Sequence, residues 1–326
     1  MVTLQGIEDP GGVRRYLDEH IFSCYSHHPI IDFDIDELCD YSAHRPMIVF
    51  DRDHFRDYHS PQIRLHQCHD SALRPFLLLN GPEPALRWEA MCEAIAEIID
   101  TLDIHRVVIV CSVPAPTPHT RPVYISQFAS RPELIGVFDG IPAAIQLSAA
   151  FSSLLTMRLG AQGIDVYGLI AHIPHYLADG EYPPAALAVL DRLMDIHHLD
   201  LPASDSLKRQ GEWARQMVDE HVKESEEFQR LLVAIEEQYD QFIADQESKA
   251  KAEIPSGDQL SAEIEAYLSA LEPSDESHDI DRMDDCDHER LIEQDLYEDS
   301  PHLIEQPSLF DYEEFSVDNE EDNDEL

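Results

Sequence analysis

The sequence is poor in positive charge. It has 22 lysines and arginines against 66 aspartates and glutamates, which gives the 326 residues a formal net charge of −44. A surface with this balance repels nucleic-acid phosphates and anionic lipid headgroups. We therefore expect a protein that neither binds nucleic acid directly nor attaches to a membrane.

Paired cysteines and an N-terminal apolar segment are also missing. The six cysteines are scattered, and no two of them form a CxxC motif. The first twenty residues carry several charged side chains, so no signal-peptide core can be drawn there. The longest uncharged stretch, residues 140–157, contains Gln146, Ser148 and Thr156, which favours a buried helix over a membrane span. These absences indicate a reduced, cytoplasmic protein.

Three common catalytic signatures are absent as well. The sequence has no GxSxG nucleophile elbow, no HExxH zinc motif and no P-loop. Two HxxH spacings begin at His66 and His172, but the first ends a predicted strand and the second contains Pro174, so neither lies on a regular helix. We predict no metal and no cofactor, and the sequence favours a non-enzymatic function over an enzymatic one.

Short apolar runs alternate with longer helical patterns over residues 1–203. The predicted strands are 2–4, 30–33, 47–50, 63–67, 75–79, 106–113, 123–128 and 166–173, and the predicted helices are 13–24, 85–102, 143–159 and 184–199. This alternation is typical of βαβ units in an α/β fold with a mostly parallel sheet. The runs 47–50 and 63–67 are expected to pair as a hairpin or edge ribbon, which would make the sheet mixed.

The pattern changes near residue 204. Apolar residues recur at helical spacing among acidic ones from Leu207 to Phe242, and a further short helix is predicted at 259–271. We therefore expect a small helical domain at 204–272 after an α/β domain at 1–203. Residues 273–326 carry 22 acidic and 2 basic side chains, which predicts a disordered acidic tail.

Polar side chains follow the predicted parallel strands at their carboxyl ends, where open α/β sheets bind ligands. The candidate crevice residues are Glu8, Asp9, Asn80, Glu83, Arg87, His119, Thr120, Arg121, His172, His175 and Tyr176. These residue types suit general acid–base chemistry or anion binding, but their spacing selects no particular reaction. Glu8 and Asp9 lie in a glycine-rich turn, where their charge disfavours a nucleotide phosphate.

Three ordered blocks resemble the proteasome assembly chaperone family, also called the PAC2 family, in its actinobacterial branch. They are Leu-Asn-Gly-Pro-Glu-Pro-Ala-Leu-Arg-Trp at 79–88, Pro-His-Thr-Arg-Pro at 118–122 and Pro-His-Tyr at 174–176. The blocks agree in order and at compatible separations, and the resemblance covers roughly residues 1–272.

The resemblance implies a three-layer α/β sandwich like that of nucleoside phosphorylases, followed by a small helical domain. It implies a factor that binds proteasome subunits, helps a core particle to assemble and forms homo-oligomers, a trimer among them. The phosphorylase-like fold leaves open a protein or enzyme that binds a nucleoside or phosphate. Archaeal relatives dock through a hydrophobic-Tyr-any ending, which the final residues 323–326 do not match.

An apolar island stands within the acidic tail. Gln306, Leu309 and Phe310 resemble the Gln-x-Ser-Leu-Phe peptide by which bacterial proteins bind the replication sliding clamp. Chance matches to a five-residue pattern are common. The tail could therefore contact the sliding clamp or act more generally as an interaction hub.

Overall fold

The computed structural model describes residues 1–6, 9–43, 45–135 and 146–253 of the chain. The described residues all belong to one compact unit of the chain, Met1–Ile264. The short helix predicted at 259–271 and the acidic tail predicted at 273–326 lie outside the described residues.

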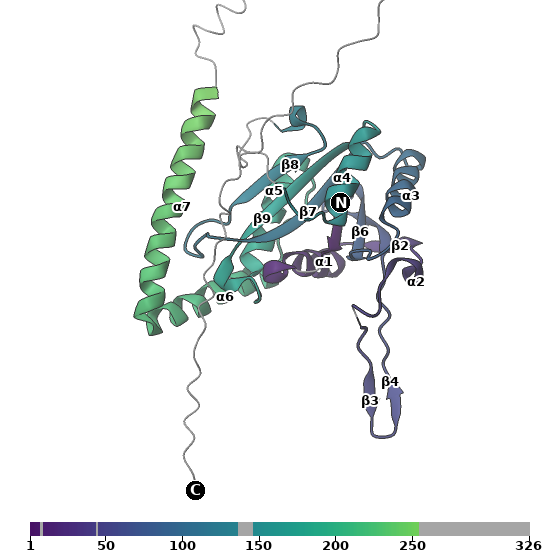
Figure 1. Ribbon diagram of the computed structural model, residues 1–326, viewed down its shortest axis with the longest axis horizontal. Helices are drawn as coiled ribbons and strands as arrows, with labels where there is room; N and C mark the ends of the chain where they lie inside the picture. Colours follow the sequence, from purple (N-terminus) through teal and green to yellow (C-terminus); the bar gives the residue numbers. More distant parts are fainter. Residues whose placement is uncertain (7–8, 44, 136–145, 254–326) are drawn as a thin grey trace, which may run out of the picture. The chain divides into compact units, whose positions relative to one another are not determined.

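A seven-stranded mixed sheet forms the centre of this unit (Figure 1). Its strand order is β2-β5-β6-β1-β7-β9-β8. The strands are β1 Val2–Gln5, β2 His27–Asp32, β5 Arg64–His69, β6 Pro75–Pro82, β7 Arg106–Ala115, β8 Ile125–Ala129 and β9 Asp165–Pro174. The four central strands, β6, β1, β7 and β9, are parallel, whereas β5 and β8 pair antiparallel with their neighbours. The prediction of a mixed sheet with a parallel centre is confirmed.

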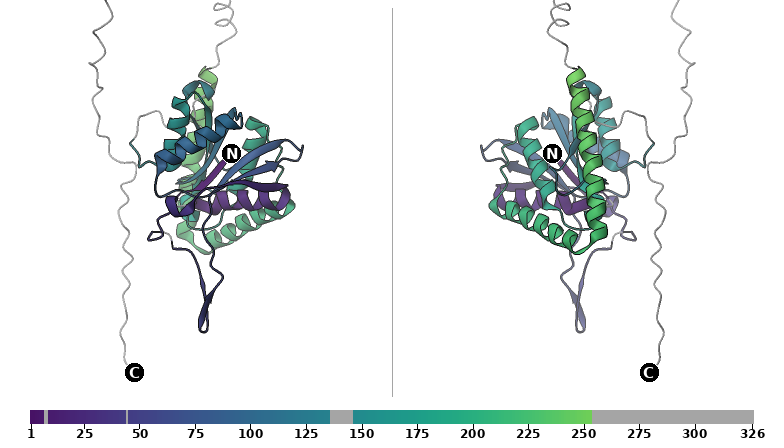
Figure 2. Two further views of the ribbon diagram at one scale, coloured as in Figure 1. Left: turned by 90° about the vertical axis from the view of Figure 1, so that its right-hand side faces the viewer. Right: turned by 90° about the vertical axis from the view of Figure 1, so that its left-hand side faces the viewer.

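Helices cover both faces of this sheet and make three layers (Figure 2). The helices beside the sheet are α1 Val13–Cys24, α2 Ile35–Leu38, α3 Trp88–Thr101, α4 Phe151–Ala161 and α5 Pro183–His197. One buried cluster joins α1 and α5 to the sheet through Val108 and Val110 of β7, and the other joins α3 and α4 to it through Val107 and Ile109. Because successive strand residues face opposite sides, the continuous apolar run of β7 serves both cores.

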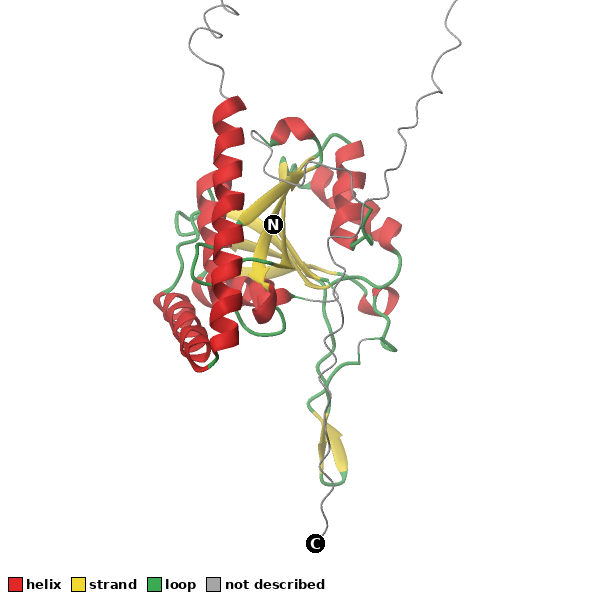
Figure 3. Ribbon diagram, turned by 60° about the vertical axis from the view of Figure 1, so that its left-hand side comes forward, coloured by secondary structure: helices red, strands yellow, loops and turns green. Residues whose placement is uncertain are grey.

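Two longer helices follow, α6 Asp205–Glu224 and α7 Glu226–Glu253 (Figure 3). The hydroxyl of Ser204 accepts the backbone N–H of Leu207 and caps the first turn of α6. Gly211 lets α6 approach α5 closely, since a Cβ there would lie 2.8 Å from Leu187. Both helices belong to the same compact unit as the sheet, so the domain boundary predicted at residue 204 stays a prediction.

One predicted pairing is wrong. The run 47–50 does not pair with 63–67; instead β3 Val49–Asp51 pairs with β4 His54–Arg56 as a separate hairpin. Residues 64–69 form β5 inside the main sheet, where Leu65 is buried. The tight turn through Arg52, whose φ of 59° lies in the left-handed region, closes the hairpin locally before the chain reaches β5.

Two helix starts differ from the prediction. α3 begins at Trp88 instead of residue 85, because the backbone N–H groups of Ala85 and Leu86 bond to the carbonyl of Leu38 and Arg87 takes a left-handed conformation. α4 begins at Phe151, and residues 143–145 of its predicted start lie outside the described residues. In the described part of the chain, no helix is long and apolar enough to cross a membrane.

Candidate functional site

The predicted crevice residues separate into groups of contacts and do not meet around one centre. Asp9, Asn80 and Glu83 lie near the carboxyl ends of β1 and β6, where they contact α1 or α4. His119, Thr120, Arg121 and Tyr176 contact α6 or α7 instead. Glu8 lies outside the described residues.

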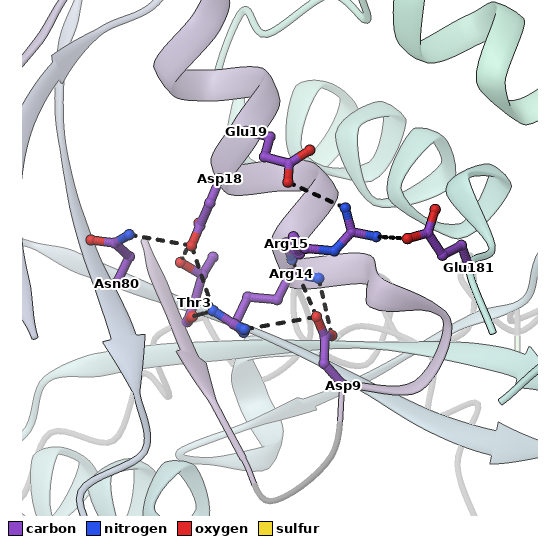
Figure 4. A network of polar contacts seen from close by, with 8 residues as sticks. All are labelled: Thr3, Asp9, Arg14, Arg15, Asp18, Glu19, Asn80 and Glu181. Atoms are coloured by element: carbon purple, nitrogen blue, oxygen red, sulfur yellow. Dashed lines mark hydrogen bonds and ion pairs between the residues drawn. The ribbon is translucent and has the colours of Figure 1, made fainter. Parts of the chain in front are cut away.

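A polar network joins Asp9 and Asn80 of the first group to α1 (Figure 4). The carboxylate of Asp9 accepts the backbone N–H of Arg14 at 3.1 Å and of Arg15 at 3.2 Å, so it satisfies donors in the first turn of the helix. On the outer side of the same helix, the Arg15 guanidinium contacts Glu181 at 2.8 Å and Glu19 at 3.2 Å. Asp9 therefore positions α1 and is not a free carboxylate.

The centre of this network is the buried carboxyl of Asp18. Its two oxygens accept the Thr3 hydroxyl at 2.7 Å and the Asn80 amide at 3.3 Å, and the Arg14 guanidinium lies 3.6 Å away. Burial raises the pKa of Asp18 to about 6, although Thr3 and Arg14 favour its ionised form. Burial also lowers the pKa of Arg14. The spacing of Arg14 and Asp18, four residues apart on one helix, is the signal that could have found this pair in the sequence.

An apolar cavity of about 570 Å³ lies beside the network, between the sheet and α4. Leu4, Ile109 and Phe151 contribute apolar surface, while Arg14 and Glu83 are charged groups at its wall. Glu83 accepts the backbone N–H of Phe151 and so caps α4. A cavity of this size and polarity suits a small, mostly apolar ligand.

The thiol of Cys111 also faces this cavity and is a weak nucleophile. Burial raises its pKa, and its Sγ atom lies 4.0 Å from the hydroxyl of Ser152. Nucleophilic cysteines need a stabilised thiolate, which burial opposes here. The cavity therefore offers binding surface, whereas its thiol is poorly suited to catalysis.

The second group holds the long C-terminal helices against the sheet, and we call it the helical clamp: His119, Arg121, Tyr176, Asp219, Glu236 and Asp240. The His119 side chain is only 1% exposed, and its Nε2 atom lies 3.2 Å from the Asp219 carboxylate on α6. Its Nδ1 atom lies 2.8 Å from the Tyr176 hydroxyl, which also accepts the backbone N–H of His119. A tautomer with the proton on Nε2 satisfies all three contacts.

Arg121 makes the corresponding contacts with α7. Its Nε and one terminal nitrogen donate to the two oxygens of Asp240 at 2.8 and 2.7 Å, and the other contacts Glu236 at 3.2 Å. These hydrogen bonds raise the pKa of Arg121 and lower that of Asp240. Thr120 donates a hydrogen bond to Glu236 as well. Sequence reasoning missed Asp219, Glu236 and Asp240, since α6 and α7 are acidic along most of their length.

The remaining predicted residues have separate surroundings. His172 lies 2.8 Å from the Ser126 hydroxyl, and burial lowers its pKa to about 4. The ring of His175 packs against that of Tyr176 at 5.3 Å. Arg87 forms an ion pair with Glu37 on α2.

Among the residues that the structure describes, no group of three or more His, Cys, Asp or Glu side chains is arranged to hold a metal ion. Gln306, Leu309 and Phe310 lie outside the described residues, so contact with a sliding clamp stays a prediction.

Comparisons with known proteins give a family and several similar structures. The model of the PAC2 family matches residues 3–222. A Mycobacterium tuberculosis protein of unknown function is 34% identical, with a TM-score of 0.71 over 76% of this chain and 84% of that chain. A Corynebacterium glutamicum ATCC 13032 protein of unknown function is 29% identical, with a TM-score of 0.70 over 75% of this chain and 91% of that chain.

A third similar structure carries a functional description. It is a proteasome-assembly chaperone homologue from Mycobacterium tuberculosis, 26% identical, with a TM-score of 0.63 over 71% of this chain and 98% of that chain. A comparison with curated proteins finds no match.

Proposed function

The chain belongs to the PAC2 family, and from this premise we propose that it is a non-enzymatic factor that binds proteasome subunits and promotes their assembly. Its similarity to a proteasome-assembly chaperone homologue supports this role. The observation that carries the proposal is the helical clamp, because it engages the side chains that would otherwise serve acid–base chemistry.

The contacts of the helical clamp favour a structural role, in which these residues hold α6 and α7 in place, over a catalytic one. A general acid or base must come within hydrogen-bond reach of substrate, whereas the His119 side chain is only 1% exposed and lies between Tyr176 and Asp219. The fork of Arg121 contacts two carboxylates of α7, which leaves it poorly placed to bind an anion. These residues present α6 and α7 in a fixed orientation beside the sheet.

The outer surface of α6 carries the side chains that we assign to subunit contact. Trp213 is 62% exposed and Met217 is 45% exposed, and their spacing of four residues places them on one face of the helix. Tryptophan and methionine are enriched at protein–protein interfaces, and tryptophan is a frequent hot spot. A subunit surface with an apolar pocket would bind this face.

The test is a binding and assembly experiment with purified actinobacterial proteasome α and β subunits. We expect the full chain to bind a subunit and to speed formation of core particles, measured by native gel electrophoresis and size-exclusion chromatography. Replacing both Trp213 and Met217 by Ala should weaken binding about tenfold or more, as expected for loss of a hot spot. Glu212→Ala, an exposed neighbour on α6, is the matched control.

Two results would distinguish a failure of the proposed function from a failure to assign the binding surface to α6. Absence of binding to either subunit, with an unchanged assembly rate, would contradict the proposed function. If the double variant and the wild-type chain bind the subunits equally well, the proposed function still holds, but the Trp213 and Met217 face of α6 is not the binding surface.

The apolar cavity favours a second candidate function, the binding of a small molecule. A ligand at a hundred times its dissociation constant stabilises the folded state by about 2.7 kcal/mol, which thermal unfolding detects. Nucleosides, inorganic phosphate and short-chain carboxylic acids are the probes to compare. If none of them raises the melting temperature, and native mass spectrometry of the purified chain finds no bound molecule, the cavity has only a structural role.

A further inference from the structure

A second apolar cavity lies at the other end of the central strands, away from the cavity beside Arg14. Its volume is about 590 Å³, which falls within the usual range of ligand pockets. It is lined by residues 75–77 of β6, by residues 106–108 of β7 and by the last turns of α3. We call this space the edge cavity.

The register of the sheet makes room for the edge cavity. β1 lies between β6 and β7, and it pairs with them from Val2, opposite Leu79 and Ile109. The first residues of β6 and β7 therefore extend beyond the start of β1. Neighbouring strands lie about 4.8 Å apart, so β6 and β7 are separated by about 10 Å at this edge. A slot of this width can take one extended hydrocarbon chain.

Most of the lining is apolar. Leu77 of β6, Phe33, and Ile95 and Ile98 of α3 all face this space. An apolar chain bound here is removed from water at one edge of the α3 core, so the hydrophobic effect favours its binding.

Two nitrogen-bearing side chains stand at the opposite wall of the edge cavity. Both Arg106 at the start of β7 and His197 at the end of α5 line the cavity. The guanidinium of Arg106 lies 5.0 Å from the ring centroid of Tyr167, and the ring of His197 lies 5.2 Å from the same centroid. Tyr167 therefore holds a cation and an imidazole at one end of an otherwise apolar space.

The imidazole of His197 has unused hydrogen-bonding capacity. Both of its ring nitrogens are buried, and neither has a hydrogen-bond partner among the described residues. A buried polar atom without a partner costs free energy, and most such atoms in native proteins are paired. A ligand oxygen at this wall would supply the missing partner.

The charge at this wall favours a negatively charged ligand. Burial lowers the pKa of His197 to about 4, and the positive charge of Arg106 lowers it as well. Asp103 is the acidic residue of the lining, but its side chain is 89% exposed and its carboxylate lies 3.7 Å from Nε2 of His105. The edge cavity is therefore locally positive in a chain whose net charge is −44.

We propose that the edge cavity binds a monocarboxylic acid with an unbranched apolar tail of medium length. Its carboxylate lies at Arg106 and His197, and its tail lies between α3 and the start of β6. Arg106 supplies a charge-assisted hydrogen bond, and neutral His197 donates its single ring N–H. This goes beyond the proposed function, because neither the α6 surface nor the cavity beside Arg14 contains these residues.

Calorimetric titration of the full chain with three eight-carbon probes tests the proposal. Octanoate should bind at least tenfold more tightly than 1-octanol, which has the same tail without the charge. It should also bind more tightly than octylamine, although the net charge of the protein favours the amine. Hexanoate lacks two methylene groups and should bind about tenfold more weakly than octanoate.

Substitutions place the acid in the edge cavity. Arg106→Gln and His197→Phe should each weaken octanoate binding at least tenfold, and the phenyl ring keeps the packing on Tyr167. Ile98→Trp fills the apolar part and should weaken octanoate and 1-octanol alike. Arg209→Gln on α6 changes the charge equally at an exposed position and is the matched control, which should bind octanoate as the wild-type chain does.

Three results would overturn the proposal. The first is absence of octanoate binding at millimolar concentration, and the second is equal binding of octanoate and 1-octanol. The third is unchanged octanoate binding by Arg106→Gln and His197→Phe, which would assign the acid to another site such as the cavity beside Arg14. The probe comparisons use the wild-type chain, so they decide the matter even if a variant fails to fold, which circular dichroism detects.

Discussion

Arg14 and Asp18 form a pair of charged residues beside the central strands, and burial dominates the behaviour of the acid. The carboxyl of Asp18 receives hydrogen bonds from Thr3 and Asn80, and its pKa is still raised to about 6. Desolvation of the ionised form therefore outweighs the hydrogen bonds and the nearby guanidinium. A raised pKa means that the folded state binds this proton more tightly than the unfolded chain does.

This difference gives Asp18 a predictable effect on stability. Its protonated form contributes stability below the ordinary pKa of 3.8, and that contribution is lost as pH rises through about 6. The side chain at position 18 stays neutral at every pH in the Asp18→Asn variant. As pH rises from 4 to 7, the free energy of unfolding of this variant should therefore increase by about 1–3 kcal/mol relative to that of the wild-type chain. Urea unfolding at both pH values measures the change.

The comparison must be made as a difference between the two proteins. His172, whose pKa is lowered to about 4, makes the wild-type chain lose stability as pH falls below 6.5, but it does so equally in both. Asp36→Asn, which removes an exposed carboxylate outside this network, is the control. A difference between Asp18→Asn and wild type that stays constant from pH 4 to 7 would contradict the assignment.

At the scale of elements, sequence periodicity predicts a helix or strand where the element buries one regular face, but it does not predict boundaries that depend on residues distant in sequence. The apolar run of β7 and the helical patterns of α1 and α5 identified these elements because each buries its own regular face. The start of α3 was not predictable, since it depends on Leu38, a residue distant in sequence that accepts the N–H groups of Ala85 and Leu86. The pairing of β3 with β4 was missed because the sequence did not mark the turn at Arg52.

The candidate site was predictable only in part, for a related reason. The sequence located polar residues at strand ends, but it could not tell which of them would meet. His119 and Arg121 come from a loop that α6 and α7 cover, and their acidic partners lie about 100 or more residues away in sequence. Many carboxylates of α6 and α7 have similar neighbours, so no local signal selects Asp219 or Asp240.

The position of α7 should depend on the Arg121 fork. Arg121→Lys keeps one positive charge but cannot donate to both oxygens of Asp240 while contacting Glu236. We expect backbone amides of α7 to exchange hydrogen faster in this variant, whereas those of the sheet stay protected. Hydrogen–deuterium exchange with mass spectrometry measures both.

A similar ion pair elsewhere provides the control for this experiment. Arg158 on α4 bonds to both oxygens of Glu89 on α3, with no contact to α7. Arg158→Lys should therefore leave exchange in α7 unchanged. If Arg121→Lys also leaves it unchanged, the fork does not hold the helix, and the apolar contacts around Tyr124 and Phe242 do so instead.

At the scale of the whole molecule, charge sets how easily two copies approach. Residues 1–272 contain 44 acidic and 20 basic side chains, and residues 273–326 contain 22 and 2, so nearly half of the net charge of −44 lies in the last sixth of the chain. Repulsion between copies grows with the product of their charges. The acidic segment should therefore oppose the self-association that the resemblance to the PAC2 family implies.

Removal of that segment should strengthen self-association in a salt-dependent way. We expect a chain ending at residue 272 to associate about tenfold more tightly than the full chain at 0.05 M salt, because each copy then carries roughly half the negative charge. At 0.5 M salt the Debye length is only about 4 Å, and the two chains should associate equally. Sedimentation equilibrium gives both constants, and circular dichroism checks that the shorter chain is folded. A tenfold difference that persists in high salt would point to direct contact by the segment, and equal constants in low salt would show that its charge does not affect association.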